Sequence, residues 1–295
     1  MIASDNLRGA ALMTLAMAGF ALEDTFLKIL SGTLPIGQIF VMLGSGGAIC
    51  FACLARLKGQ AIFFTGALSR PVLIRNLGEL IAAVGWLAAI ALTPLSSAAA
   101  ILQATPLAVT LGAALFMGAE VGWRRWAAIL VGFLGVLMII RPGLSGFEPA
   151  SLFAVLGVIG LAIRDLATRA VPAHISSLQL SAHAFAIVVP VGALMLLVGG
   201  GGVMPTPLIW VNLAAALFFG VVAYYWIVGA MRVGEVAVVT PFRYTRLIFA
   251  LLIGVLIFGE RPDLMTLLGA GIIIASGLYT FLRERALGRR AATLI

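Results

Sequence analysis

The chain has 295 residues, of which 62% are hydrophobic and 10% are charged, with a formal net charge of +8. Soluble domains carry about 25% charged residues, so these proportions exclude an aqueous globular fold. The basic residues lie in short loops and at the C-terminus rather than on one soluble face, which favours a role in membrane orientation over nucleic-acid binding.

Ten apolar segments follow one another along the chain, each bounded by charge, glycine or proline. About 20 apolar residues suffice to cross a ~30 Å hydrocarbon core. The segments are continuously apolar, whereas a transmembrane β-barrel needs short segments of alternating polarity, so a barrel is excluded. The sequence predicts an all-α integral membrane protein with spans at 9–29, 35–55, 72–92, 97–117, 126–140, 151–170, 177–198, 208–229, 236–258 and 264–282.

Two parts of this series have local features of their own. The segment 126–140 is short, and we expect Trp123, Arg124 and Arg125 to extend it at the membrane interface. Residues 170–231 include no Asp, Glu, Lys or Arg, so this stretch must hold two spans and the turn between them.

The basic residues in the loops and toward the ends of the spans indicate an orientation. With both termini in the cytoplasm, three of them face outward and fourteen face inward, which satisfies the positive-inside rule. The outward ones are Lys28, Arg141 and Arg261. The inward ones are Arg8, Arg56, Lys58, Arg70, Arg75, Arg124, Arg125, Arg164, Arg169, Arg232, Arg283, Arg285, Arg289 and Arg290. We therefore expect a multi-pass protein of the bacterial inner membrane with cytoplasmic N- and C-termini.

The chain also repeats itself at an offset of about 141 residues. The matched segments are Gly19 to Asp24 with Gly160 to Asp165, Gln38 with Gln179, and Gly118 and Glu120 with Gly259 and Glu260-Arg261. Each half has five spans, an odd number, so the second copy enters the membrane inverted, as in many secondary transporters with a site near the midplane. The expected parts are a first repeat at 9–141, a second at 151–282 and a basic cytoplasmic tail at 283–295.

Charged residues recur at matched places in the two copies. Each copy has an acid and a base at i and i+4, a spacing that supports a helical ion pair. These pairs are Asp24 with Lys28 and Asp165 with Arg169. Neutralisation of charge at a helix end is the first interpretation of these pairs, and a functional role is the second. Glu23 and Arg164 break the symmetry with unlike charges, and they are better candidates for a gate or a substrate contact.

Glycine-containing motifs recur where each half ends. The first half has Gly118 to Trp126, then Gly132-Phe-Leu-Gly135 and Arg141-Pro142-Gly143. The second has Phe258-Gly259-Glu260-Arg-Pro, Gly269 and Gly277-Leu-Tyr279, and Thr93-Pro94 leads to Gln103-Ala-Thr-Pro106 in the fourth span. Together these motifs resemble EamA-type drug/metabolite transporters over almost the whole chain.

The resemblance implies ten helices in two inverted EamA repeats, with a central cavity lined mainly by the first, third, fourth, sixth, eighth and ninth helices. Members of this family move amino acids, vitamins such as riboflavin, S-adenosylmethionine, nucleotide-sugars and other metabolites. No short motif specifies which of these a given member carries.

Ionisable side chains inside a span are costly and therefore mark functional candidates. Glu79 lies about 12 Å into the third span by helical rise. Arg243 and Arg246 share one face of the ninth span, and we expect one of them to pair with Glu79. Two interpretations stay open: the pair fastens the two helices together, or the second arginine binds an anionic or polar substrate group.

Other candidates are aromatic or neutral. Trp86 and Tyr244 offer flat rings with a polar tip to an aromatic solute. Gln103 adds a hydrogen-bonding group beside Pro106, which frees a backbone carbonyl. His183 is either a proton relay or a hydrogen-bonding partner of a neighbouring helix.

Three other classes of membrane protein fit the sequence less well than a carrier. An intramembrane serine protease is suggested by Gly143-Leu-Ser145-Gly146, but this motif falls in a loop. A sensor or scaffold usually has a soluble output domain, which the sequence lacks. Inverted repeats favour a carrier over a channel.

The sequence therefore predicts a non-enzymatic secondary transporter that moves a small organic metabolite by alternating access. A riboflavin-like vitamin is the first candidate, and amino-acid or metabolite export is the alternative. The expected partners are the substrate and the lipid bilayer, without nucleic acid, metal or cofactor, and a homodimer is left open.

Overall fold

A computed structural model describes residues 2–64, 66–119, 121–144, 147–172, 174–233 and 236–292, and every regular element in these ranges is a helix. This confirms the all-α fold. The elements are α1 (Ile2–Ser31), α2 (Ile36–Leu57), α3 (Arg70–Leu92), α4 (Leu95–Leu102), α5 (Thr105–Phe116), α6 (Trp123–Ile140), α7 (Ser151–Arg169), α8 (Ser177–Val198), α9 (Pro207–Val233), α10 (Val236–Val239), the 3-10 helix η1 (Thr240–Tyr244), α11 (Thr245–Leu256) and α12 (Leu264–Ala292).

Two of the expected spans are broken rather than continuous. Among the described residues, nine helical segments are long and apolar enough to cross a bilayer, and α4 with α5 makes one of them. The expected span at 97–117 is interrupted between Leu102 and Thr105. The expected span at 236–258 is divided into α10, η1 and α11. Proline stands in the first turn after both breaks, at Pro106 and Pro241, and it cannot donate the backbone hydrogen bond that a continuous helix needs.

α6 begins at Trp123, which agrees with the expected extension of the short span 126–140 by Trp123, Arg124 and Arg125. The first and last helices extend well beyond the apolar runs that indicated them. α1 begins at Ile2 instead of residue 9, and α12 continues to Ala292 instead of ending at 282. The backbone hydrogen bonds of a helix continue through polar residues, whereas the prediction stopped at the first charge. Residues 283–292 of the expected basic tail are therefore helical and continue α12.

The helices form two compact units, each of which combines segments from both sequence halves. Unit 1 comprises Met1–Leu22, Thr93–Leu152 and Val222–Ile295, and unit 2 comprises Glu23–Leu92 and Phe153–Val221. Both α1 and α9 contribute one part to each unit.

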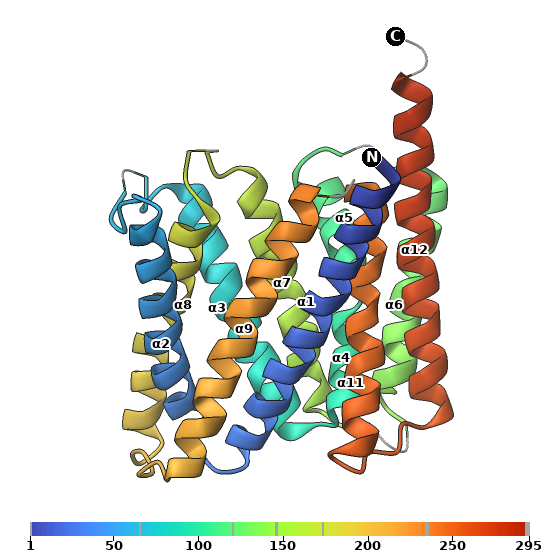
Figure 1. Cartoon of the computed structure of the whole chain (residues 1–295). Coiled ribbons are helices and arrows are strands. Elements are labelled where there is room, and N and C mark those ends of the chain that lie inside the picture. The colour runs from blue at the N-terminus through green and yellow to red at the C-terminus, as the bar shows by residue number, and fades with distance from the viewer. Residues whose placement is uncertain are drawn as a thin grey trace. The chain divides into compact units, whose positions relative to one another are not determined.

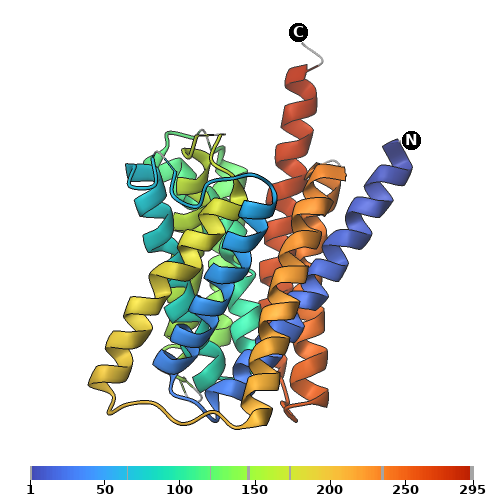
Figure 2. The same cartoon turned by 60° about the vertical axis from the view of Figure 1, so that its left-hand side comes forward.

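Within unit 2, α2 packs directly on α8, its counterpart in the repeat (Figures 1 and 2). Glycines make the close approach possible: a Cβ at Gly37 would lie 2.7 Å from the carbonyl oxygen of Gly192, and one at Gly44 would lie 2.9 Å from that of Phe185. As residue numbers rise along α2 they fall along α8, so the two counterparts run antiparallel. The second copy is therefore inverted relative to the first, as expected.

Within unit 1, α6 and α12 repeat this arrangement (Figure 1). A Cβ at Gly135 would lie 2.8 Å from the carbonyl oxygen of Gly269, and one at Gly269 would lie 2.6 Å from that of Gly135. Small residues at such crossings let membrane helices pack through their backbones. Elsewhere in unit 1, Met13 and Ala16 of α1 pack with Ala230 of α9.

Candidate functional site

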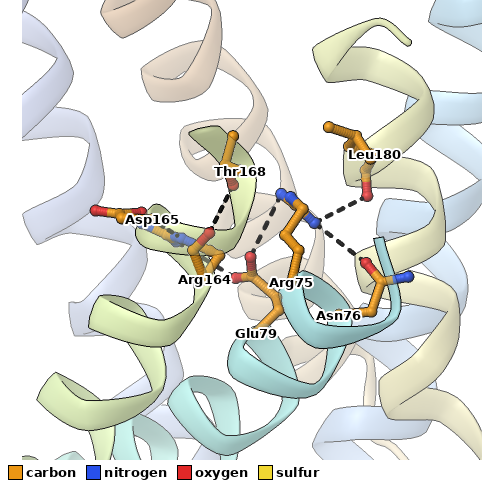
Figure 3. A network of polar contacts seen from close by, with 7 residues as sticks. All are labelled: Arg75, Asn76, Glu79, Arg164, Asp165, Thr168 and Leu180. Atoms are coloured by element: carbon orange, nitrogen blue, oxygen red, sulfur yellow. Dashed lines mark hydrogen bonds and ion pairs between the residues drawn. The ribbon is translucent and has the colours of Figure 1, made fainter. Parts of the chain in front are cut away.

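Unit 2 holds a cluster of charged side chains on α3 and α7 (Figure 3). The two carboxylate oxygens of Glu79 face different guanidinium groups, with Oε1 lying 3.5 Å from Nη1 of Arg164 and Oε2 lying 3.6 Å from Nη2 of Arg75. Arg164 also contacts Asp165 at 2.8 Å. Two arginines thus meet two carboxylates, and the charges of the cluster balance.

The same cluster extends to α8. Nη1 of Arg75 donates to the carbonyl oxygen of Leu180 and to the side-chain oxygen of Asn76, each at 3.3 Å. Arg75 is buried, with 8% of its surface exposed. Since Arg75 contacts Leu180 and Glu79 contacts Arg164, the network joins α3 to both α8 and α7.

Glycines bring the backbones of α3 and α7 together at this point. A Cβ at Gly78 would lie 2.6 Å from the backbone nitrogen of Arg164, and one at Gly85 would lie 2.5 Å from that of Gly157. The short separation lets Glu79 reach Arg164. A buried carboxylate without such partners would be strongly destabilising in a membrane span, so the network neutralises an otherwise costly charge.

The network gives Glu79 partners other than those expected. Its described ion pairs are with Arg75 and Arg164 of its own unit. The expected pairing with Arg243 or Arg246 stays a prediction.

The acid and base of α1 are both bonded to α3. The indole Nε1 of Trp86 donates to Oδ1 of Asp24 at 2.8 Å, and Nζ of Lys28 donates to the carbonyl oxygen of Ile90 at 3.0 Å. Asp24 is 1% exposed, whereas Trp86 is half-buried. The bond to Asp24 restrains the Trp86 ring. The two bonds also show that Asp24 and Lys28 hold α1 to α3, a role that the i, i+4 spacing did not predict.

Glu23 and Arg164 occupy matched places but have different neighbours. Gly220 is the counterpart of Glu79 in the repeat, and the carboxylate of Glu23 lies against it: a Cβ at Gly220 would lie 2.6 Å from Oε1 of Glu23. The contact between α3 and α7 therefore contains an ion pair, Glu79 with Arg164. In the equivalent contact between α9 and α1, a carboxylate lies against a glycine. The unlike charges of Glu23 and Arg164 at matched places in the sequence therefore correspond to unlike contacts in the structure.

In unit 1, the two helix breaks meet. Nε2 of Gln103, at the end of α4, lies 3.5 Å from the carbonyl oxygen of Tyr244, at the end of η1. These two residues are 141 positions apart and are therefore repeat counterparts. Transporters commonly place substrate and ion sites at such interruptions, where backbone groups are freed from the helix.

The three other candidates of unit 1 are placed differently. Tyr244 is buried, and its hydroxyl lies against Gly277 of α12, so its ring is not an open stacking surface. The guanidinium of Arg246 lies 5.3 Å from the ring centre of Phe20, which is a cation–π contact. Arg243 is exposed.

The sequence did not predict the structural role of Glu260, which it showed only as part of the repeat and of a motif. Its carboxylate accepts hydrogen bonds from the backbone nitrogens of Leu95 at 2.6 Å and Ser96 at 2.9 Å. Glu260 thus caps the N-terminus of α4 from 165 residues away, where the helix dipole favours a negative charge. Sequence alone gave no signal for so distant a cap.

Two glutamines hold loops that belong to the opposite repeat. Gln38 of α2 bonds both backbone groups of Val203 in the loop after α8, with Nε2 to the carbonyl oxygen at 2.6 Å and Oε1 to the nitrogen at 2.8 Å. Gln179 of α8 donates to the carbonyl oxygen of Ala61, in the loop after α2, at 2.6 Å. The sequence showed that Gln38 and Gln179 are repeat counterparts, but their role in holding loops became clear only from the structure.

His183 supports the same loop as Gln179. Its Nε2 lies 3.0 Å from the carbonyl oxygen of Ile62, and its ring packs on Phe64. The contact is with a loop rather than with the neighbouring helix expected for a structural histidine. Ser145 and Glu120 lie outside the described residues.

Comparison with known proteins adds the decisive observation. The EamA-like transporter family matches this chain twice, at residues 7–141 and 149–282. The chain belongs to that family. The resemblance inferred from the glycine motifs is therefore confirmed.

Several relatives of this EamA protein have named functions. It is 30% identical over 207 residues to a riboflavin transporter of Rhizobium johnstonii, covering 70% of this chain and 68% of the relative. It is 28% identical over 228 residues to an S-adenosylmethionine uptake transporter of Rickettsia felis, covering 74% of each chain. It is 28% identical over 282 residues to the pseudopaline exporter CntI of Pseudomonas aeruginosa, covering 91% of this chain and 94% of the exporter.

These relatives are all membrane transporters, and this EamA protein is a multi-pass membrane transporter as predicted. Their names are consistent with a non-enzymatic function. A solved crystal structure also matches the fold, with a TM-score of 0.60 and 19% identity over 97% of this chain and 99% of the other.

Proposed function

We propose that this EamA protein is a secondary transporter that moves a heteroaromatic metabolite of the riboflavin kind by alternating access. The observation that carries the substrate class is the fixed, partly exposed ring of Trp86 on α3. Its bond to buried Asp24 sets the ring plane in advance, which lowers the entropy lost when a flat solute stacks on it. The riboflavin transporter relative supports the same class.

The proposed roles of the other candidates follow their placement. Gln103, at the meeting of the two helix breaks, orients the solute through its carboxamide. Glu23, Glu79 and Arg164 act as gating charges, because they form unlike contacts at matched places. Arg243 and Arg246 supply positive charge to a polar group of the solute, and Tyr244 positions the broken helix through its contact with Gly277.

Reconstituted transport tests the substrate class directly. Proteoliposomes containing the full chain should take up radiolabelled riboflavin with saturable kinetics and show counterflow when preloaded with the unlabelled vitamin. Trp86→Ala should lower the rate at low riboflavin at least tenfold, because the stacking surface is lost. Trp86→Phe keeps a ring but loses the bond to Asp24, and it should have an intermediate effect.

The matched control is Trp210→Phe, since Trp210 of α9 is 56% exposed and remote in sequence from every candidate. Its uptake should equal that of wild type. Absence of saturable riboflavin flux in the wild type, or an unchanged rate for Trp86→Ala, would refute a riboflavin-like substrate.

Export of an amino acid or related metabolite is the second candidate, and the guanidinium pair of Arg75 and Arg164 favours it. Both groups face one carboxylate, Glu79, at 3.5–3.6 Å, longer than the 2.7–2.9 Å typical of a tight charge-assisted bond. A carboxylate of the solute could compete for the same guanidinium groups. Counterflow of a labelled amino-acid panel, with riboflavin present and absent, distinguishes the two candidates.

We also propose that the protein lies in the bacterial inner membrane with both termini in the cytoplasm. The excess of basic residues in one set of loops supports this orientation. A Cys50→Ser/Cys53→Ser background allows single cysteines at Lys58 and Gly201 to be probed with an impermeant maleimide on intact spheroplasts. Cysteine at Gly201 should be labelled and cysteine at Lys58 protected, and the reverse pattern would invert the topology.

A further inference from the structure

A groove of about 400 Å³ runs between α6 and α12 in unit 1. Its floor is apolar and made of small residues, including Ala127 and Ala275, both exposed, and Ala128. Pockets of 300–1,000 Å³ are the size that proteins use for small ligands, but this one has almost no polar group along its floor. A long hydrocarbon chain matches such a surface.

Charged and aromatic residues surround one end of the groove. Trp123 and Tyr279 line it there, one from each helix, and both types mark the membrane–water interface. Arg124 also lines this end, and its guanidinium lies 5.3 Å from the ring centre of Trp123. The cation–π contact keeps the charge at the mouth of the groove.

A second arginine lies at the same level. α6 and α12 are antiparallel, with Gly132 against Ser276 and Gly135 against Ile273. This register brings Arg283, one turn beyond Tyr279, level with Arg124. The groove therefore has an apolar body and Arg124 at its rim, with Arg283 of α12 at the same level of the helix pair. This combination fits an acyl chain attached to a phosphate.

We propose that the groove between α6 and α12 binds an anionic phospholipid, with an acyl chain on its floor and the headgroup phosphate at Arg124 and Arg283. The charge at the rim selects an anionic lipid over a zwitterionic one. A second copy of the chain is the other conceivable occupant. A two-fold contact through this groove would bring the same arginines of both copies together, and like charges disfavour it.

Native mass spectrometry of the full chain tests the proposal with phosphatidylglycerol and phosphatidylcholine of identical acyl chains as probes. Wild type should retain phosphatidylglycerol preferentially. Arg124→Gln should weaken that retention about fivefold, and adding Arg283→Gln should weaken it further, as expected for basic residues near an anionic headgroup. Ala127→Leu with Ala275→Leu fills the groove from two exposed positions and should reduce retention without changing the arginines.

Two control variants match these changes elsewhere. Arg70→Gln removes an exposed arginine at the start of α3, and Ala214→Leu enlarges an exposed alanine on α9. Both should retain phosphatidylglycerol as wild type does. Equal retention by wild type and the groove variants, or equal losses in the controls, would overturn the proposal. So would a change from dimer to monomer in the groove-filling variant with lipid retention unchanged, because a second copy would then be the occupant.

Discussion

The side chain of Gln103 reaches the backbone carbonyl of Tyr244, its own counterpart 141 residues later in the chain. Contact between two equivalent residues is what a two-fold relation between the repeats produces. Gly44 and Phe185, also separated by one repeat length, are in contact in the same way within unit 2. Each compact unit thus contains a contact between two residues that occupy equivalent positions in the two repeats.

Replacement of Gln103 should impair transport more than folding. Gln103→Leu removes the carboxamide at the meeting of the two broken helices but keeps similar volume, and the net value of one such hydrogen bond is about 1 kcal/mol. We expect a fall of at least fivefold in proteoliposome flux with a small shift of the melting temperature. Thr110→Ala is the control, since Thr110 bonds only within its own helix. Flux equal to that of wild type would remove Gln103 from the site.

The α6–α12 crossing should not tolerate a methyl group at Gly135. Gly135→Ala places Cβ 2.8 Å from the carbonyl oxygen of Gly269, so the helices must separate, at a cost of about 1–3 kcal/mol. Gly271→Ala is a matched control on α12, because nothing lies within 4 Å of its added Cβ. Thermal unfolding in detergent should rank Gly135→Ala below wild type and leave Gly271→Ala unchanged or slightly more stable. Equal melting temperatures for the two variants would contradict the packing described.

Loss of the cap on α4 should destabilise unit 1. Glu260→Ala leaves the nitrogens of Leu95 and Ser96 without their carboxylate, and caps of this kind contribute about 0.5–2 kcal/mol. Glu260→Gln keeps one acceptor oxygen, so its melting temperature should lie between those of wild type and Glu260→Ala. Melting curves of both variants, with Glu148→Ala as a control at an exposed loop residue, measure the effect. A Glu148→Ala loss as large as that of Glu260→Ala would argue against a specific cap.

The stability of the loop between α11 and α12 should depend on acid pH. Arg141 and the backbone nitrogen of Thr266 donate to Asp263, and these bonds lower the pKa of its carboxyl to about 2. Because the pKa is depressed, the stabilisation is present above the ordinary Asp pKa of about 3.9 and is lost as pH falls through about 2. Since the Asp263 side chain is 50% exposed, the effect should stay below about 1 kcal/mol.

The measurement compares wild type with Asp263→Asn between pH 5 and pH 2. Wild type should lose its advantage over the variant in this window, and the difference should shrink at high salt. A constant difference across the window would show that Asp263 contributes no charge-dependent stability.

The sequence predicted the helices and the inverted repeat well because both depend on features that are local or periodic. Hydrophobic runs of span length indicate helices directly, and an odd number of spans per repeat requires inversion. The sequence analysis predicted continuous spans where the structure has helix breaks near Gln103 and before Tyr244, although the sequence contains Pro106 and Pro241 at these places. A proline inside an apolar run signals an interruption only once its neighbours show that the helix does not continue around it.

Partners of the charged candidates were harder to predict. The sequence did not predict the pairing of Glu79 with Arg164, which Gly78 and Gly160 allow because they bring α7 close to α3. Which helices touch depends on small residues on both surfaces, and a single sequence does not show which glycines face each other. The cap by Glu260 was hidden for the same reason.

The reciprocal bonds of Gln38 and Gln179 bear on the origin of the molecule. Gln38 of the first repeat bonds a loop of the second repeat, and Gln179 of the second repeat bonds a loop of the first. A single five-helix repeat therefore contains both the glutamine and the loop that such a bond needs. Two identical short chains, inserted in opposite directions, could clasp one another through the same pair of bonds before fusion joined them into one polypeptide.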